Sequence, residues 1–217
     1  MTNKLTEACL PVEWLVMGPI DNNVYIIEDD AATFVVDPSC QPERILAALG
    51  DRKLGAIVIT HRHWDHVGAA AALRKATGAV VIASEVDAAG IEKPSDPRIP
   101  PCPVDWKVNH GDIVQIGNMP WKVIGTPGHT PGGICLYIDP RFGTNPQGNP
   151  LLISGDTLFC GAIGRTDFEG GSFQAMQHSL KRLAVLPDGT IVLPGHNSLT
   201  SIGAERQRVF ARYAPRM

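Results

Sequence analysis

The chain has 217 residues, of which 44% are hydrophobic and 19% charged, so we expect one soluble domain of ordinary composition over residues 1–217. Its formal net charge of −3 at pH 7 provides no basic field for nucleic acid as a partner. Residues 1–20 contain no long apolar run, so we expect no signal peptide, no membrane anchor and a cytoplasmic location.

Short runs of β-branched and aromatic residues open the chain and alternate with turn-forming sequences, which predicts strands. Strands are predicted over residues 12–18, 23–28, 32–37, 55–60 and 79–84. A short helix is predicted over residues 42–49, where Gly50 ends it. The alanine-rich run over residues 66–77 predicts one further helix that ends at Gly78.

The second half of the chain begins with residues 92–105, whose five prolines predict an irregular loop. Strand patterns then resume, over residues 111–116, 119–126, 134–139, 151–156 and 191–196. Residues 172–186 predict a helix with Ser172 as its N-cap. Because strands dominate both halves and helices only interrupt them, we expect an α/β fold of two packed sheets with helices outside.

A cluster of metal-ligand residues follows the predicted strand over residues 55–60. It consists of His61, His63, Asp65 and His66, in the sequence HRHWDH. Imidazole nitrogens and carboxylate oxygens are ligands that Zn²⁺ and Fe²⁺ accept. The two histidines in extended chain can turn toward one ion, while the pair that enters the helix points in another direction. One loop can therefore supply two neighbouring metal sites.

Three more candidate ligands follow predicted strands, each next to a glycine that allows a sharp turn. They are His129 in TPGHTPGG, Asp156 in ISGDTLF and His196 in LPGHN. Each alone is equally consistent with a turn histidine or a capping aspartate. Together with residues 61–66 they form a set of seven candidate ligands at one edge of the sheets. We interpret His110 and His178, which lie outside these patterns, as turn and helix-surface residues.

The ordered motifs THRHWDH, TPGHTPGG, SGD and PGH resemble those of the metallo-β-lactamase superfamily, from about Asn23 to His196. The resemblance implies an αββα sandwich with two divalent metals at one edge, Zn²⁺ first and Fe or Mn as alternatives. It further implies the metal ligands: His61, His63 and His129 for the first metal, Asp65, His66 and His196 for the second, and Asp156 as the bridge.

Within this superfamily the sequence is similar to short bacterial relatives of glyoxalase II, the hydroxyacylglutathione hydrolases. The segment GDTLFCGAIGRTDFEGG resembles the one in which those enzymes place a basic residue for the glutathione carboxylate, and Arg165 matches that position. The alternative is an arginine tied into its own loop. Long glyoxalase II enzymes add a helical C-terminal domain, which we do not expect here, and follow the last histidine with Glu-Tyr. This chain has Asn197 and Ser198 there.

The resemblance implies hydrolysis of a small-molecule thioester, with a glutathione thioester as the first candidate and no nucleic-acid or membrane partner. Two adjacent cations lower the pKa of a shared water toward ~7, which yields a hydroxide nucleophile, and Asp65 is expected to orient it and accept its proton. A persulfide dioxygenase with one iron on His61, His129 and Asp156 is the main alternative, because GRTDFEGG also resembles that class. Lactone hydrolysis, β-lactam hydrolysis and a non-catalytic metal-binding module are further alternatives.

Overall fold

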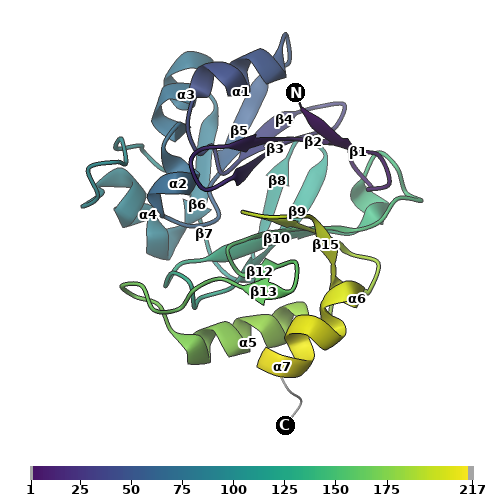
Figure 1. The fold of residues 1–217 in the computed structure, drawn as a ribbon. Helices are drawn as coiled ribbons and strands as arrows, with labels where there is room; N and C mark the ends of the chain where they lie inside the picture. Colours follow the sequence, from purple (N-terminus) through teal and green to yellow (C-terminus); the bar gives the residue numbers. More distant parts are fainter. Residues whose placement is uncertain (1, 215–217) are drawn as a thin grey trace.

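The computed structural model describes residues 2–214, which form two β-sheets packed face to face between outer layers of helices (Figure 1). The first sheet has seven strands in sequence order: β1 (Asn3–Leu5), β2 (Val12–Met17), β3 (Asn22–Glu28), β4 (Thr33–Val36), β5 (Leu54–Val58), β6 (Val80–Ser84) and β7 (Trp106–Val108). The second has six strands, in the order β15 (Thr200–Ser201), β14 (Ile191–Pro194), β11 (Leu151–Gly155), β10 (Ile134–Ile138), β9 (Met119–Gly125) and β8 (Ile113–Ile116). The predicted αββα sandwich is confirmed.

The helices fall into two sets, one outside each sheet (Figure 1). The first set is α1 (Pro42–Leu49), α2 (Trp64–Val67), α3 (Ala70–Thr77) and α4 (Glu85–Glu92). The second is α5 (Phe173–Leu183), α6 (Ile202–Glu205), the π-helical turn η2 (Arg206–Phe210) and α7 (Ala211–Tyr213). A 3-10 turn, η1 (Pro140–Phe142), and a hairpin of β12 (Leu158–Phe159) and β13 (Ala162–Ile163) complete the described elements. None of the helices among residues 2–214 has the length and apolar character that a membrane crossing requires.

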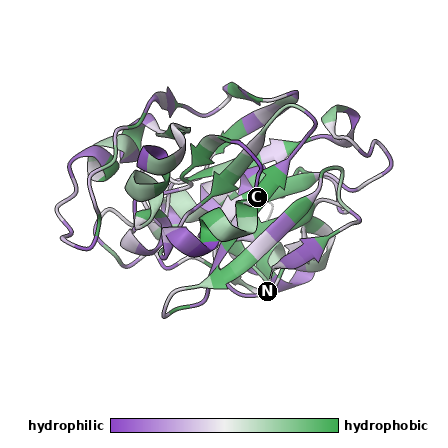
Figure 2. Cartoon of the chain, turned by 90° about the horizontal axis from the view of Figure 1, so that it is seen from above, coloured by the Kyte–Doolittle hydropathy of each residue, from purple (hydrophilic) through white to green (hydrophobic). Residues whose placement is uncertain are grey.

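Both faces of the central strands are buried. In β3, Tyr25 and Ile27 face the layer between the sheets, whereas Val24 and Ile26 face the first helix layer. Strands covered on both faces are apolar at nearly every position, which explains the uninterrupted apolar runs of the sequence. Figure 2 shows these hydrophobic residues concentrated in the strands, with hydrophilic residues mainly in the peripheral loops.

The prediction of one continuous helix over residues 66–77 is wrong. The structure has two helices there, α2 and α3, separated at Gly68 and Ala69. The amide of Ala69 donates to the carbonyl of Pro38 at 2.9 Å rather than to a carbonyl one turn back along the helix. A Cβ at Gly68 would lie 2.3 Å from the carbonyl oxygen of Ser39. Contact with the loop after β4 therefore breaks the helix. Helices α4, α6 and α7 were not predicted.

The topology brings several strand ends to one edge of the sandwich. Strands β4, β5 and β6 run parallel to one another in the first sheet, and β11 runs parallel to β14 in the second. Carboxyl ends of parallel strands meet at the same edge, so the loops that follow them are neighbours. An isolated bridge between Asn22 and His196 ties the start of β3 to the loop after β14, which joins the two sheets there.

Candidate metal centre

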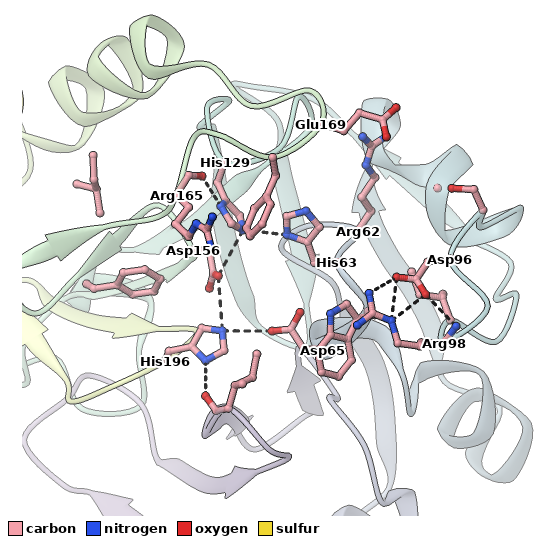
Figure 3. Close-up of a pocket in the computed structure, with 18 of the residues that line it drawn as sticks. Arg62, His63, Asp65, Asp96, Arg98, His129, Asp156, Arg165, Glu169 and His196 are labelled. Carbon is pink, nitrogen blue, oxygen red and sulfur yellow. Dashed lines mark hydrogen bonds and ion pairs between the residues drawn. The ribbon is translucent and has the colours of Figure 1, made fainter.

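The seven predicted ligands come together at this edge, on loops that follow β5, β9, β11 and β14. Figure 3 shows the members of the set that face the cavity: His63, Asp65, His129, Asp156 and His196. Residues after β5 supply His61, the helix cap His63, and Asp65 and His66 in α2. The other three sit one to four residues beyond their strands: His129, Asp156 and His196. Sequence positions more than 130 residues apart are thus neighbours in space.

The ligand atoms form two clusters. In the first cluster, atoms of His61, His63 and His129 all lie within 4.8 Å of one another. In the second cluster, atoms of Asp65, His66 and His196 meet the same limit.

Asp156 lies between the two clusters, on the loop after β11. Its Oδ2 is 3.4 Å from Nε2 of His129, in the first cluster, and 3.5 Å from Nε2 of His196, in the second. Its Oδ1 is 3.5 Å from Nε2 of His66. One carboxylate therefore faces both clusters, as a bridging ligand requires.

A glycine allows the second-sheet loop to close on the others. Gly195 precedes His196, and a Cβ there would lie 2.3 Å from Asp156 Oδ1 and 2.7 Å from His66 Cε1. Any side chain would displace two candidate ligands. The PGH sequence therefore reflects a close backbone approach rather than only a turn.

Two of the histidines are held by backbone carbonyls. Nδ1 of His129 is 2.7 Å from the carbonyl oxygen of Arg165, and Nδ1 of His196 is 3.0 Å from that of Ile20. A carbonyl can only accept, so each Nδ1 carries the proton and donates it. Each Nε2 is left as an acceptor that points into the centre, the arrangement usual for a metal-bound imidazole.

The remaining support comes from Asp37, which lies just past β4 and which the sequence analysis missed. Its Oδ2 is 3.0 Å from Nδ1 of His66 and accepts a 2.6 Å hydrogen bond from Oγ1 of Thr60. That hydroxyl lies 3.1 Å from Nδ1 of His61. Asp37 thus orients one imidazole directly and another through Thr60. The signal was present, because Asp37 follows an apolar strand as Asp156 does.

The residue set fits a pair of divalent cations. Among residues 2–214, four buried atoms in the centre have no hydrogen-bond partner: Asn22 Oδ1, His61 Nε2, His66 Nε2 and Asp156 Oδ1. Leaving such an atom unsatisfied costs about 1–3 kcal/mol. In addition, Nδ1 of His63 lies 2.9 Å from Nε2 of His129, a pair of ring nitrogens that a shared cation would satisfy.

The electrostatics of the first cluster favour neutral imidazoles. Burial, with the neighbouring histidines adding to it, holds the pKa of His61 well below its ordinary value. The same causes lower the pKa of His63 to about 4. A neutral imidazole is the form that binds a metal, so these two ligands need lose no proton near pH 7.

Carboxylates dominate the surroundings of the imidazoles in the second cluster. Burial opposes protonation of His66, but the carboxylates of Asp156 and Asp37 outweigh it and raise its pKa well above the ordinary value. Burial works against ionisation of Asp65, yet the adjacent imidazoles of His196 and His66, whose Nε2 atoms lie 3.2 and 3.1 Å from its Oδ2, hold its pKa far below the usual range. Burial raises the pKa of Asp156 itself.

A cavity of about 750 Å³ opens onto both clusters (Figure 3). This volume suits a small-molecule substrate. Its wall includes Phe168, whose ring centroid lies 5.6 Å from that of His63 and 5.9 Å from that of His129. The cavity is therefore apolar on one side and lined by candidate ligands on its floor.

Arg165, the predicted anion-binding residue, lines this cavity, but its guanidinium is already paired. Its Nη2 lies 2.7 Å from Oδ2 of Asp167, and its Cζ lies 4.3 Å from the centroid of the Phe168 ring. The side chain of Arg165 is thus tied into its own loop, the alternative recognised from the sequence. His110 and His178 are exposed and lie outside both clusters.

The chain matches a known protein family over most of its length. Residues 17–196 match the metallo-beta-lactamase superfamily. The chain belongs to this superfamily. An uncharacterized protein from Aquifex aeolicus is 36% identical over 200 residues, which cover 88% of this chain and 91% of that protein. A hydroxyacylglutathione hydrolase from Pseudomonas aeruginosa is 38% identical over 180 residues, which cover 81% of this chain and only 62% of that enzyme.

Solved structures of the superfamily share the fold. BLEG-1 B3 metallo-β-lactamase superposes with a TM-score of 0.82 at 30% identity, over 92% of this chain and 98% of the other. A protein solved in a di-iron-bound form, TTHA1623, gives 0.75 at 32% identity, over 89% and 96% of the two chains. ETHE1 from Myxococcus xanthus gives 0.74 at 30% identity, over 100% and 86%.

Proposed function

We propose that this superfamily member is a dinuclear metal-dependent hydrolase that cleaves thioesters, of the hydroxyacylglutathione hydrolase type. The observation that carries the proposal is the carboxylate of Asp156, which faces both ligand clusters at the floor of the cavity. We assign one divalent cation to each cluster, with Zn²⁺ first and Fe or Mn as alternatives.

The chemistry follows from the placement of these groups. A pair of bound divalent cations supplies hydroxide near neutral pH and stabilises negative charge on a developing oxyanion. Asp65 lines the cavity, and Nδ2 of Asn22 donates to its Oδ2 at 2.9 Å, which fixes the carboxylate. Because Asp65 stays ionised, it accepts a hydrogen bond from the incoming water and orients it. A leaving thiol has an ordinary pKa of about 8.5, so it departs without a dedicated acid.

Similarity to known enzymes supports the same substrate class. Hydroxyacylglutathione hydrolases from several Pseudomonas species are 38–40% identical to this chain. The match spans less than two thirds of each of those enzymes, so the thioester activity is a proposal for this chain.

The test is thiol release from S-lactoylglutathione by zinc-loaded protein of measured metal content. We expect turnover by the wild type and its loss in Asp156→Ala. His178→Ala, which changes an exposed residue outside both clusters, is the matched control and should retain activity. Protein with two metals per chain and no activity on any thioester would exclude the thioesterase assignment.

A persulfide dioxygenase is the second candidate, favoured by residues 164–171, GRTDFEGG, which border the cavity beside His129. One iron on His61, His129 and Asp156 would suffice for it. Oxygen uptake by iron-loaded protein with glutathione persulfide tests this. Rapid uptake with one iron per chain and no thioester turnover would favour the dioxygenase over the hydrolase. The similarity to BLEG-1 makes nitrocefin a useful additional substrate for β-lactam hydrolysis.

A further inference from the structure

Three arginines and no lysine line the cavity, and two of them are neutralised there. Arg98 lies 2.5 Å from Asp96 and 4.4 Å above the ring of Trp64. Arg165 is held in the same way, by Asp167 and by the ring of Phe168. In both cases the guanidinium forms an ion pair with an aspartate two residues away and lies over an aromatic ring.

Arg62 is the exception. Within residues 2–214 its guanidinium makes no ion pair and no hydrogen bond, and only its backbone amide is bonded, to Asp87 at 3.1 Å. Glu169 also lines the cavity but forms no ion pair with it. Figure 3 shows the Arg62 side chain extending from beside His63 toward Glu169. The unpaired guanidinium of the cavity therefore lies on the wall beside the first cluster, at the end nearer Glu169.

A glycine from another segment makes room for the stem of this side chain. A Cβ at Gly90, inside α4, would lie 2.6 Å from Cδ of Arg62. At the guanidinium end, a Cβ at Gly170 would lie at an ordinary contact distance of 3.4 Å from Nη2. A glycine inside a helix costs roughly 1 kcal/mol relative to alanine. The helix tolerates Gly90, and the space it leaves is filled by the stem of Arg62.

We propose that Arg62 binds a carboxylate of the substrate and that the substrate class is therefore anionic thioesters. The proposal rests on the thioesterase function proposed above. An unpaired guanidinium presents parallel N–H donors that match a carboxylate, whereas those of Arg98 and Arg165 already bind aspartates. Arg62 takes the role that the sequence analysis predicted for Arg165.

The first experiment compares Arg62→Gln with Arg165→Gln on three thioesters. Lactoylglutathione carries carboxylates on the thiol side, succinyl-N-acetylcysteamine carries one on the acyl side, and lactoyl-N-acetylcysteamine carries none. A hydrogen bond to a charged group contributes about 1.5–3 kcal/mol, so we expect Arg62→Gln to raise KM roughly tenfold to a hundredfold. The increase should affect an anionic thioester only, with kcat and metal content little changed.

The KM changes of Arg62→Gln on the three thioesters show where the bound carboxylate lies in the substrate. An increase for lactoylglutathione alone places the bound carboxylate on the thiol side, and an increase for the succinyl thioester alone places it on the acyl side. Equal KM changes for the neutral thioester, or an anion-selective loss in Arg165→Gln instead, would overturn the assignment. Gly90→Ala, which fills the space of the Arg62 stem without touching the metal ligands, should raise the same KM values as Arg62→Gln.

A binding measurement separates this inference from the proposed function. S-methylglutathione carries carboxylates but no thioester, so titration calorimetry with metal-loaded protein does not depend on turnover. We expect binding by the wild type and at least tenfold weaker binding by Arg62→Gln. That result supports the carboxylate site even where no thioester is hydrolysed. Equal binding by both proteins, or none by the wild type, refutes a site for the thiol-side carboxylates, and an unchanged KM of Arg62→Gln for the succinyl thioester then refutes the proposal as a whole.

Discussion

The two ligand clusters stand a few ångströms apart, and each has two buried members and one that is partly exposed, yet they differ in charge. The first consists of three imidazoles, and His63 is partly exposed to the cavity. The second combines two imidazoles with Asp65 and has a further carboxylate, Asp37, behind His66, which is 0% exposed. We infer that the first cluster binds its cation mainly through neutral nitrogen donors, and the second also through negative charge.

The largest effect is expected where the two clusters share a residue. Asp156→Ala removes the carboxylate that faces both, so both metals should bind more weakly and kcat/KM should fall roughly a thousandfold or more. Elemental analysis after dialysis, together with the thiol-release assay, measures both losses. If this variant keeps two metals per chain, the bridging role is wrong.

A pair of variants should separate the clusters. His196→Ala removes a ligand from the second cluster only, and His63→Ala removes one from the first only. Each should retain about one metal per chain and lose most thioesterase activity, because both cations are needed. Mass spectrometry under native conditions measures how many metals each variant retains. Loss of both metals in either variant would mean that the clusters bind as one unit.

Asp37→Asn tests the charge behind the second cluster. Asp37 has φ +48°, a conformation that asparagine also tolerates, so the backbone should be unaffected. Loss of such a partner typically weakens metal binding 10- to 100-fold. We expect this loss at the second cluster, measured by chelator competition. Asp139→Asn, at an exposed turn, is the control, and equal weakening in both variants would argue against a specific role.

The grouping of the candidate ligands at one edge was predictable from the sequence because each set follows an apolar strand, and strand ends are readable from local patterns. His129, Asp156 and His196 could therefore be placed at one edge before the topology was known. The sandwich was predictable for the same reason, since apolar runs of strand length mark buried strands.

What the sequence left open depends on contacts between distant segments. The break between α2 and α3 comes from the loop after β4, and no local propensity encodes that contact. Arg165 matched a family segment, but its pairing with Asp167 became visible only in three dimensions. The free guanidinium of Arg62 likewise depends on Gly90, which lies in a helix that was not predicted.

The smallest predicted effect concerns Thr60, the hydroxyl between the clusters. Its Oγ1 donates to Asp37, so it must accept from Nδ1 of His61. The hydrogen bond that Nδ1 of His66 donates directly to Asp37 does not depend on Thr60. Thr60→Val keeps the shape and removes the hydroxyl. A neutral hydrogen bond contributes about 0.5–1.5 kcal/mol, so the first cluster should bind its metal roughly two- to tenfold more weakly.

Metal affinity at the second cluster should be almost unchanged in Thr60→Val. Asp37→Asn, in contrast, should weaken metal binding mainly at that second cluster. Thr60→Ser restores the hydroxyl and should restore affinity at the first cluster, which a purely structural role for the methyl group would not produce. Chelator competition with cobalt-loaded protein can follow the two sites separately, because the clusters differ in nitrogen and oxygen donors. Equal weakening at both clusters would show that Thr60 supports Asp37 as a whole, and that the two clusters are less independent than their charges suggest.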